Sequence, residues 1–432
     1  MTAWNTFTPT AQKPWDVRRV AHLHRRAVFG LTASELRRDV ASKPQDAISR
    51  VFSGEGREGV PLEFANLQRV IGDAAVGQGN VNRLKAWWIY QLIFSPDPLR
   101  ERLTFLWHNH FATSNLKVNS LLQMKEQNEL FREHARGEFG TLLHATLRDP
   151  ALLRWLDAET NRKDHANENL GRELLELFTL GVGNFTEADV KNAARALTGL
   201  EVERGEFRFN EGRHDDGEKT VLGQTKHFDP EELAELLLAD AATSWRLAGK
   251  LIAEFFAPGV IDKAAHAELA HQLTASHLNV GRAVETILRS DLFFSDDNIN
   301  QRITDPLTFL IAPIRSFELF ETPPSTLTLA DWLQRMGLDL FYPPNVAGWP
   351  GGRAWLTTRT VIARANYAAA VVSGEIHRVP SAPDLERLAA TPDDFQTLMN
   401  TLLTGSADDN FSGEEYSEIA LKILTGTRVH LH

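Results

Sequence analysis

Apolar residues recur three and four positions apart along most of this chain, and this spacing is the feature that most constrains its fold. It places apolar side chains on one face of an α-helix, whereas a half-buried strand would need them at every second position. The spacing is clearest in four runs, which cover residues 230–257, 262–276, 280–290 and 306–320. The segment from Thr186 to Asp189 has the form of a helix N-cap. The sequence therefore predicts a mainly α protein.

Alternating side chains, the signal for a strand, are concentrated in one segment. Residues 200–209 have the sequence LEVERGEFRF, and a polar stretch containing TVLG continues to residue 228. This pattern favours one small β hairpin around residues 200–222 within a single large multi-helix body. We expect a helical body over residues 1–380, the hairpin and its loop over 200–228 within it, and a C-terminal helical tail over 381–432.

The composition excludes several classes of function. The 432 residues include no cysteine, so only His, Asp and Glu remain as plausible metal ligands. The net charge of −11 argues against nucleic acid as a partner. The most apolar stretch, residues 86–94, is shorter than the ~18 residues of a membrane span. No apolar segment follows the arginine pair at 18 and 19. We therefore expect no membrane insertion, no signal peptide and a cytoplasmic location.

The first segment with candidate chemistry is WHNHFATS, residues 107–114, at the end of an apolar run. On a helix, His108 and His110 point about 200° apart, so they cannot bind one metal ion together. One interpretation is that both are core histidines. The other is that His110 faces a pocket as a ligand or general base, with His108 and Asn109 as binding residues.

The second segment is NENLGRELLELFTLG, at residues 167–181. Four polar residues fall on one narrow stripe of the predicted helix: Asn169, Arg172, Glu173 and Glu176. If the stripe faces water, Arg172 pairs with Glu168 and Glu176 and contributes little. If it faces a cleft, Glu173 and Glu176 bind a divalent ion or divide acid and base roles. Asn169 and Arg172 are then candidate binding residues.

The third segment is HDDGEKTVLGQ, residues 214–224, which follows the predicted hairpin. Charged, glycine-containing loops often carry function, so His214 and Asp215 are candidate catalytic residues and Lys219 is a candidate binding residue. The spacing does not match a calcium-binding EF-hand loop. A plain solvated turn is the alternative interpretation.

The fourth segment is YPPNVAGWPGGRAWL, residues 342–356. Its three prolines and three glycines exclude a regular helix or a central strand. One interpretation is an ordered, buried connection. The other is a binding loop in which Trp349 and Arg353 offer an aromatic wall and a cation to a sugar, a ring or a carboxylate.

Long stretches of the chain resemble the bacterial domain-of-unknown-function 1800 family. The matching stretches are residues 107–114, 167–199, 214–224 and 343–356, with a weaker match at 21–32. Val28, Gly171 and Leu200 depart from the family pattern, which usually has Gly, Ala and Trp there. The resemblance implies no reaction. It does imply that many members are exported, and that an uncharacterised sulfatase-like protein encoded by a neighbouring gene is a candidate partner.

Two hypotheses follow from these segments. In the first, the chain is a hydrolase-like enzyme, metal-assisted or acid–base, with His110, Glu173, His214 and Asp215 as catalytic residues. A divalent metal would then be held by Glu173, Glu176 and His110. In the second, the chain is a non-catalytic binding or scaffold protein that engages a glycan or a protein partner. We expect the four segments to meet in space, because each places polar side chains in a constrained or apolar setting.

Overall fold

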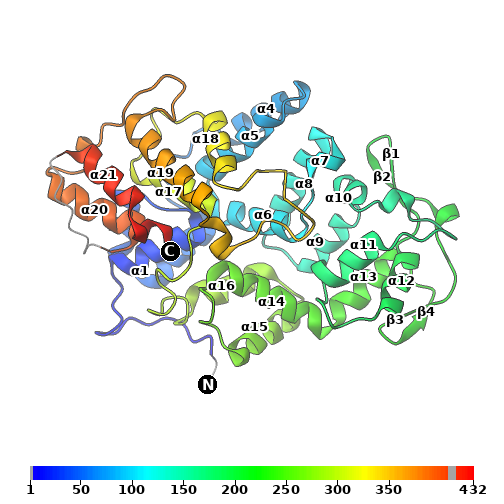
Figure 1. The fold of residues 1–432 in the computed structure, drawn as a ribbon. Helices are drawn as coiled ribbons and strands as arrows, with labels where there is room; N and C mark the ends of the chain where they lie inside the picture. The colour runs from blue at the N-terminus through cyan, green and yellow to red at the C-terminus, as the bar shows by residue number, and fades with distance from the viewer. Residues whose placement is uncertain (1–2, 407–414) are drawn as a thin grey trace.

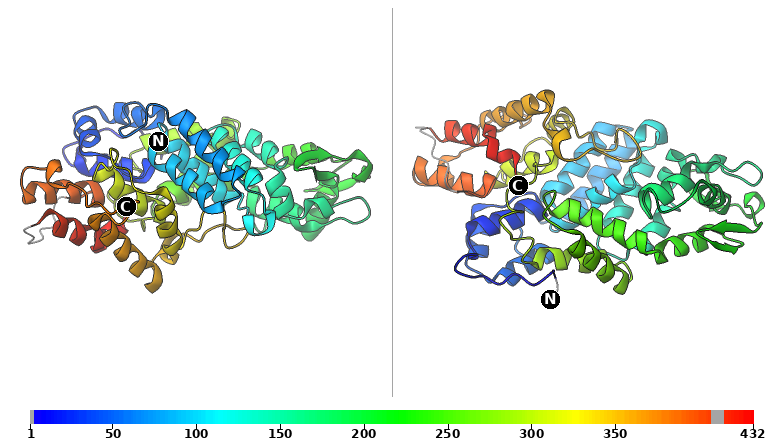
Figure 2. Two further views of the ribbon diagram at one scale, coloured as in Figure 1. Left: turned by 90° about the horizontal axis from the view of Figure 1, so that it is seen from above. Right: turned by 60° about the horizontal axis from the view of Figure 1, so that its bottom comes forward.

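The computed structural model of the chain describes residues 3–406 and 415–432. Helices make up most of these residues, and short strands form two hairpins (Figure 1). The molecule is elongated, with the hairpins at one end and helices α20 and α21 at the other (Figures 1 and 2). The prediction of a mainly α protein is confirmed.

The described residues up to 196 form twelve α-helices, a short 3₁₀ helix, η1 (Ala158–Thr160), and a π-helical turn, η2. The helices before residue 95 are α1 (Val17–Val28), α2 (Ala33–Val40), α3 (Pro44–Ser53), α4 (Phe64–Gly77) and α5 (Val81–Phe94). Those that follow are α6 (Pro98–His110), α7 (Asn115–Val118), α8 (Leu121–Glu133), α9 (Phe139–Thr146) and α10 (Pro150–Trp155). The second motif segment forms α11 (Glu168–Glu173) and η2 (Leu174–Phe178), and α12 (Glu187–Ala196) follows it.

The second half begins with the hairpins and continues with helices. The strands are β1 (Leu200–Glu203), β2 (Glu206–Phe209), β3 (Lys219–Val221) and β4 (Gln224–Lys226). The next helices are α13 (Pro230–Ala239), α14 (Ala241–Phe255), α15 (Lys263–Ala275) and α16 (Val280–Arg289). The last are α17 (Pro306–Ser316), α18 (Thr326–Arg335), α19 (Thr358–Ser373), α20 (Pro392–Thr404) and α21 (Tyr416–Thr425). Within the described residues, none of these helices is both long enough and apolar enough to cross a bilayer.

Side-chain caps explain where several helices begin. The Thr186 hydroxyl accepts a hydrogen bond from Asp189 N, and the Asp189 carboxylate accepts one from Thr186 N, which is the cap that the sequence predicts. The apolar run over residues 230–257 forms two helices instead of one. It breaks at Asp240, whose carboxylate accepts a hydrogen bond from Ala242 N and so caps α14.

The structure contains two hairpins where the sequence predicts one. Strands β1 and β2 are antiparallel, with Leu200 opposite Phe209, and β3 and β4 are antiparallel, with Lys219 opposite Lys226. The second hairpin turns at Leu222 and Gly223, which both have positive φ angles, as a tight two-residue turn requires. Its strands have three residues each, which is too short for alternation to be visible in the sequence.

The apolar side chains form two cores that share a wall. One core lies around α6, α9, α13, α14 and α16, and the other lies around α5, α17, α18, α19 and α20. Helices α1 and α6 contribute to both. Leu23 and Leu103 are buried in the first core, and Val20 and Phe105 in the second. These two helices therefore form the boundary between the cores.

The C-terminal helices pack against the N-terminal ones, as Figure 1 shows. Helix α20 contacts α1, α2 and α17, and α21 contacts α19. Buried arginines of α1 extend this contact. Arg26 Nη1 donates to Phe255 O at 2.8 Å and Arg26 Nη2 donates to His432 O. The C-terminal segment is therefore packed against α1.

Arg102 is a buried cation that contacts elements of both cores. Its side chain, on α6, donates to Glu254 Oε1 of α14 at 2.9 Å and to Thr308 Oγ1 of α17 at 2.7 Å. The Asp305 carboxylate, which caps α17, lies 3.4 Å away. The guanidinium also lies 4.1 Å from the ring centroid of Phe29, at the end of α1. One side chain therefore joins four helices.

We predict that Arg102→Met destabilises the protein by about 3–5 kcal/mol, because it leaves the buried carboxylates of Glu254 and Asp305 without their main partner. Chemical denaturation should show the loss in the free energy of unfolding. The matched control is Arg69→Met, since Arg69 forms an exposed ion pair with Asp73. Equal midpoints for the two variants would contradict the prediction.

Candidate functional site

His110 ends α6 in a buried position, at 3% exposure. Its Nε2 lies 3.1 Å from Phe178 O, so Nε2 carries the proton and donates it to that carbonyl. The rings of Trp107, Phe111, Phe139 and Phe178 surround the imidazole. Its second nitrogen, Nδ1, is buried and has no hydrogen-bond partner among the described residues. The ring therefore presents an unused lone pair.

The carbonyl that His110 binds belongs to the π-helical turn η2, at the end of the second motif segment. Such turns expose carbonyl groups that an α-helix would use internally, and they are frequent at functional sites. Side chains from other segments satisfy two of these groups. Phe178 O accepts from His110, and Leu177 O accepts from Arg246 Nε at 2.7 Å. The turn thus joins α6 to α14.

Helix α14 brings a second cation to the same place. Lys250 lies four residues after Arg246 and therefore on the same face of α14. Its side chain is half-buried, and within the described chain its ammonium has no hydrogen bond or ion pair. Burial, and then the charge of Arg246, lower the pKa of Lys250 to about 8. Burial, followed by the charges of Lys250 and Arg246, also lowers the pKa of His110 well below its ordinary value.

Glu173 and Glu176 are half-buried on the adjoining turn. Burial, and then the charge of Glu176, raise the pKa of Glu173 above its ordinary value. Glu176 also interacts with the guanidinium of Arg246, whose pKa it raises against the opposing effect of burial. Five titratable groups therefore interact, each with the next, in the spatial order Glu173, Glu176, Arg246, Lys250 and His110.

The other two polar residues of the stripe point elsewhere. Arg172 donates to Glu168 Oε2 at 3.0 Å and to Glu187 Oε2 at 2.7 Å, on the surface. The expected ion pair between Arg172 and Glu176 is therefore wrong. Asn169 Nδ2 lies 3.4 Å from Asp157 Oδ2, on a neighbouring loop.

The fourth segment meets the first. Trp349 N donates to Asn109 Oδ1 at 2.7 Å, and the Trp349 ring stacks on Phe105 with centroids 5.6 Å apart. Gly348 lies against Asn109 with a φ of +87°, where an added Cβ would lie 2.2 Å from Asn109 Oδ1. Arg353 is exposed. Around Gly348 and Trp349 this segment is thus an ordered connection that covers the end of α6.

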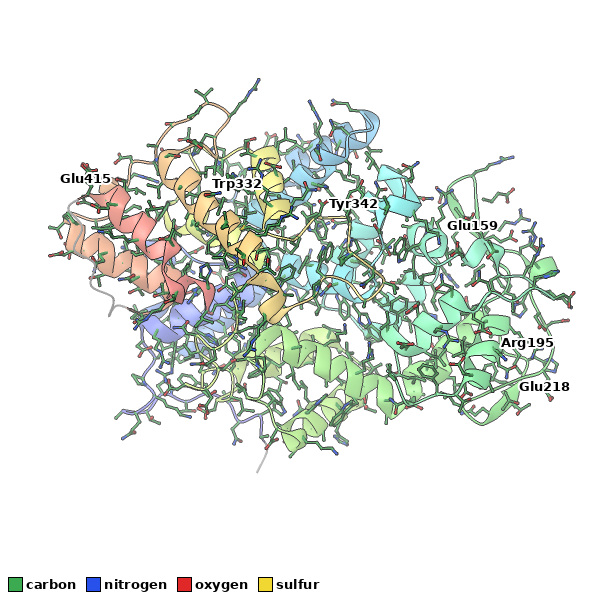
Figure 3. All side chains as sticks on the ribbon, viewed as in Figure 1. Glu159, Arg195, Glu218, Trp332, Tyr342 and Glu415 are labelled. Carbon is green, nitrogen blue, oxygen red and sulfur yellow. The ribbon has the colours of Figure 1, made fainter. Side chains whose placement is uncertain are left out.

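The third segment packs on α12, away from this cluster. Arg195 Nε of α12 donates to Asp215 Oδ2 at 2.7 Å, and His214 Nδ1 donates to Thr198 O at 2.9 Å. Lys219 Nζ donates to Gly217 O within its own loop. In Figure 3, Arg195 and Glu218 lie at the hairpin end of the molecule, whereas Tyr342 of the fourth segment lies near its middle. The contacts therefore bring three segments together at the end of α6 and leave the third apart.

His108 has the contacts of a core histidine. Asn128 Nδ2 donates to His108 Nε2 at 2.9 Å, and the Trp88 ring lies 4.4 Å away between centroids. Asn128 Oδ1 in turn accepts from Arg132 Nη2 at 2.7 Å, and Arg132 is paired with Glu101. Burial, and then Arg132, lower the pKa of His108 well below its ordinary value.

The metal hypothesis gains no support from the geometry. Across residues 3–406 and 415–432, no three His, Asp or Glu side chains are grouped as the ligands of a metal ion would be. His110, Glu173 and Glu176 are linked through Arg246 and Lys250, and a cation is unfavourable beside a metal ion.

Sequence analysis alone missed Arg246 and Lys250, the two cations of the cluster. The signal that could have found them is their spacing in the segment SWRLAGKLIAEFF, residues 244–256, where two cations four positions apart interrupt an otherwise apolar run. That spacing does not indicate which carbonyl and carboxylate groups these cations contact. Their partners lie about 70 positions earlier in the chain.

Comparison with known proteins gives one match. The model of a family described as "Protein of unknown function (DUF1800)" matches residues 22–427. No curated protein and no solved structure matches the chain.

We predict that Gly348→Ala destabilises the protein by about 1–2 kcal/mol through its left-handed backbone alone, and by more through the contact with Asn109. Thermal unfolding should show the loss. Gly351→Ala is the matched control, because Gly351 lies in the same loop, has an ordinary φ and has no atom within 4 Å of an added Cβ. Equal midpoints would show that the loop does not depend on this contact.

Asp149 is a buried titratable group close to the first segment. It caps α10, accepts from Leu152 N at 2.8 Å, and accepts at 2.6 Å from Gln127 Nε2, which also donates to Thr113. Burial raises its pKa to about 7, against the lowering effect of these hydrogen bonds. Since the folded state keeps a proton that the unfolded state has lost, this group makes stability fall as the pH rises from about 4 to about 7.

The stability of Asp149→Asn relative to the parent should therefore increase as the pH rises from about 4 to about 7, and the difference should persist at higher pH. Asparagine caps a helix as well as aspartate does, but it does not ionise. We expect a gain on the order of 2 kcal/mol at pH ~8 in denaturant unfolding. Asp262→Asn, at the exposed cap of α15, is the control. A difference that stays constant from pH ~4 to ~8 would contradict the prediction.

Proposed function

The chain belongs to the DUF1800 family, whose description names no activity, and we propose that it is an acid–base enzyme acting on an anionic substrate. The site lies where the end of α6, the π-helical turn and α14 meet. Its working groups are Lys250, Arg246, Glu173 and Glu176, with His110 behind them. Hydrolysis is the reaction class that this set of groups suits best, because it needs one group to take a proton and another to give one.

One observation carries the proposal, which is that the half-buried ammonium of Lys250 has no hydrogen-bond or ion-pair partner among the described residues. A charged group that is partly removed from water is normally paired, because leaving it unpaired is costly. An ammonium offers donors only, so Lys250 favours a ligand that supplies an acceptor. His110 Nδ1 is also buried without a partner among the described residues, but it is a lone pair and needs a donor instead.

The balance of charge favours an anion as that ligand. Arg246 and Lys250 present two cations from one face of α14, and both are half-buried. Burial and the charge of Arg246 lower the pKa of Lys250, which means that they disfavour its charged form. A bound anion would favour that charged form again. Glu176 balances Arg246 in part, so the unpaired charge of the cluster is that of Lys250.

The proposed roles follow from the protonation of each group. With a pKa of about 8, Lys250 is mostly protonated near physiological pH, so it pairs with the anion and gives a proton. Glu173, whose pKa is raised by burial and by Glu176, is the carboxylate that takes one. Arg246, held by Leu177 O, orients the anionic group of the substrate. His110 is a positioning residue, since its Nε2 holds the turn through Phe178 O.

A purely structural role accounts for only part of this cluster. His110 and Arg246 satisfy carbonyls at the end of a helix, as cations and imidazoles often do. Lys250 satisfies none, and its burial in a charged state is unfavourable. Residues that lower stability in this way are common in active sites and uncommon elsewhere.

We predict that Lys250→Met keeps or raises stability by on the order of 1 kcal/mol, because it replaces a poorly solvated ammonium with an apolar chain. The same variant should lower kcat/KM by about 10²-fold or more. Stability is measured by denaturant unfolding. Turnover is measured with chromogenic phosphate, sulfate and carboxylate esters, using the ester that the parent hydrolyses best.

Lys263→Met, at an exposed position on α15, is the matched control and should change neither quantity. A second measurement needs no substrate. Acetylation of Lys250 by acetic anhydride should titrate near pH 8, and inorganic phosphate should protect it. A Lys250→Met variant that loses stability, together with a Lys250 that no anion protects, would favour the non-catalytic binding or scaffold alternative.

A further inference from the structure

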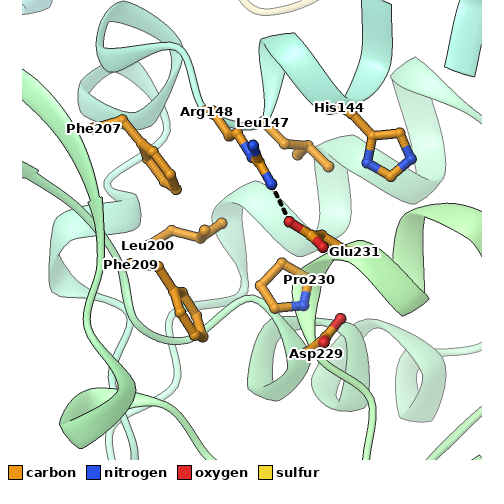
Figure 4. Close-up of a pocket in the computed structure, with 9 residues that line it drawn as sticks. All are labelled: His144, Leu147, Arg148, Leu200, Phe207, Phe209, Asp229, Pro230 and Glu231. Carbon is orange, nitrogen blue, oxygen red and sulfur yellow. Dashed lines mark hydrogen bonds and ion pairs between the residues drawn. The ribbon is translucent and has the colours of Figure 1, made fainter. Parts of the chain in front are cut away.

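A cavity of about 180 Å³ lies between the first hairpin and the helices beneath it. Figure 4 shows the residues that surround it. The hairpin supplies Leu200, Phe207 and Phe209. Helix α9 supplies His144 near its end, and the residues just after it supply Leu147 and Arg148. The start of α13 supplies Asp229, Pro230 and Glu231. None of these residues belongs to the cluster at the end of α6.

The floor of this cavity is apolar because of the hairpin register. Leu200 lies opposite Phe209 and Val202 opposite Phe207, so these four side chains share the face of the hairpin that is turned toward the helices. Leu147 and Pro230 close the other side. Leu200 is buried, whereas its partner Phe209 stays 38% exposed at the edge of the cavity. A large aromatic side chain is thus left without a full covering.

The volume fits a single ring. Apolar cavities of about 150 Å³ in proteins are known to bind one benzene molecule. The present cavity is slightly larger, at about 180 Å³, and two phenyl groups line it. Aromatic rings prefer offset or edge-to-face contact with other rings, so this lining favours an aromatic occupant over an aliphatic one. A sugar is disfavoured, because the apolar floor would leave its hydroxyl groups without partners.

The rim of the cavity carries one cation and one anion side by side. Arg148 and Glu231 form an ion pair there, and their side chains are 54% and 61% exposed. The Arg148 guanidinium also lies 5.9 Å from the centroid of the Phe207 ring. An exposed ion pair contributes little stability, so a ligand can replace each partner of the pair at small cost in free energy. His144, by contrast, is engaged by Glu235 at 2.7 Å.

We propose that this cavity binds an aromatic amino-acid residue, with its ring between Phe207 and Phe209 and its main-chain polar groups on the Arg148–Glu231 pair. The carbonyl or carboxylate of the residue accepts from Arg148, and its N–H or ammonium donates to Glu231. A phenylalanine-type residue supplies an aromatic ring, an acceptor and a donor. The residue is either a free amino acid or part of a peptide, since both present the same groups.

The test uses two aromatic probes and one aliphatic probe. N-acetyl-phenylalanine amide represents a residue within a peptide, free phenylalanine represents the amino acid, and N-acetyl-leucine amide is the aliphatic comparison. Saturation-transfer NMR with the full chain should show transfer to the aromatic ring protons and little transfer to the leucine probe. The aromatic probe with the higher affinity identifies the source.

Variants then locate the binding. Leu147→Phe fills the cavity and should weaken binding at least ~10-fold. Arg148→Met, at the exposed rim, should weaken the binding of free phenylalanine about threefold. The matched control is Arg208→Met, because Arg208 forms an equally exposed pair with Glu203 on the opposite face of the same hairpin. It should leave the affinity unchanged.

Three results would overturn the proposal. One is absence of transfer to both aromatic probes. Another is equal binding of the leucine probe, which would remove the argument from the two phenyl groups. The third is an Arg148→Met variant that binds free phenylalanine as the Arg208→Met control does. Since Arg148 is exposed, that variant keeps the fold, so the comparison holds even if Leu147→Phe unfolds the protein.

Discussion

The position of the Arg102 guanidinium is the constraint on which the rest of the structure depends. It reaches carboxylates on α14 and at the start of α17 and lies against Phe29 at the end of α1, so it fixes α6 between the two cores. The end of α6 lies eight residues later, or about 12 Å along the helix. The ion pair of Arg102 therefore fixes the helix that carries His110 and ties it to α14, the helix that carries Arg246 and Lys250.

The end of α6 shows how a helix terminus can be both a structural joint and a chemical site. The carbonyls of Leu177 and Phe178 need donors, and His110 and Arg246 supply them from two other segments. That requirement brings charged side chains into a partly buried place. Lys250 lies one turn beyond Arg246 and is partly buried as Arg246 is, but it makes no hydrogen bond like that of Arg246 to Leu177 O. The cluster therefore contains one charge that the fold itself does not use.

The sequence predicts those parts of this protein that depend on local interactions. Helix α16 begins and ends within one residue of its apolar run, because period and caps are encoded together. The second hairpin was missed because three-residue strands carry too little alternation. The pairing of Arg172 with Glu176 was wrong because the helix widens after Glu173, so an ideal-helix projection places Glu176 incorrectly. Arg246, some 70 residues later, is its actual neighbour, which no local pattern could indicate.

The π-helical turn also sets a strict count of residues across the site. Widening a helix by one residue per turn is equivalent to inserting that residue, so removing one between Leu174 and Phe178 would restore an ordinary helix. Everything beyond the deletion would then rotate by about 100° relative to Glu173. The carbonyl of Phe178 would no longer face His110, although every side chain of the cluster would still be present. Chain length across this turn is therefore as much a part of the site as the identity of its residues.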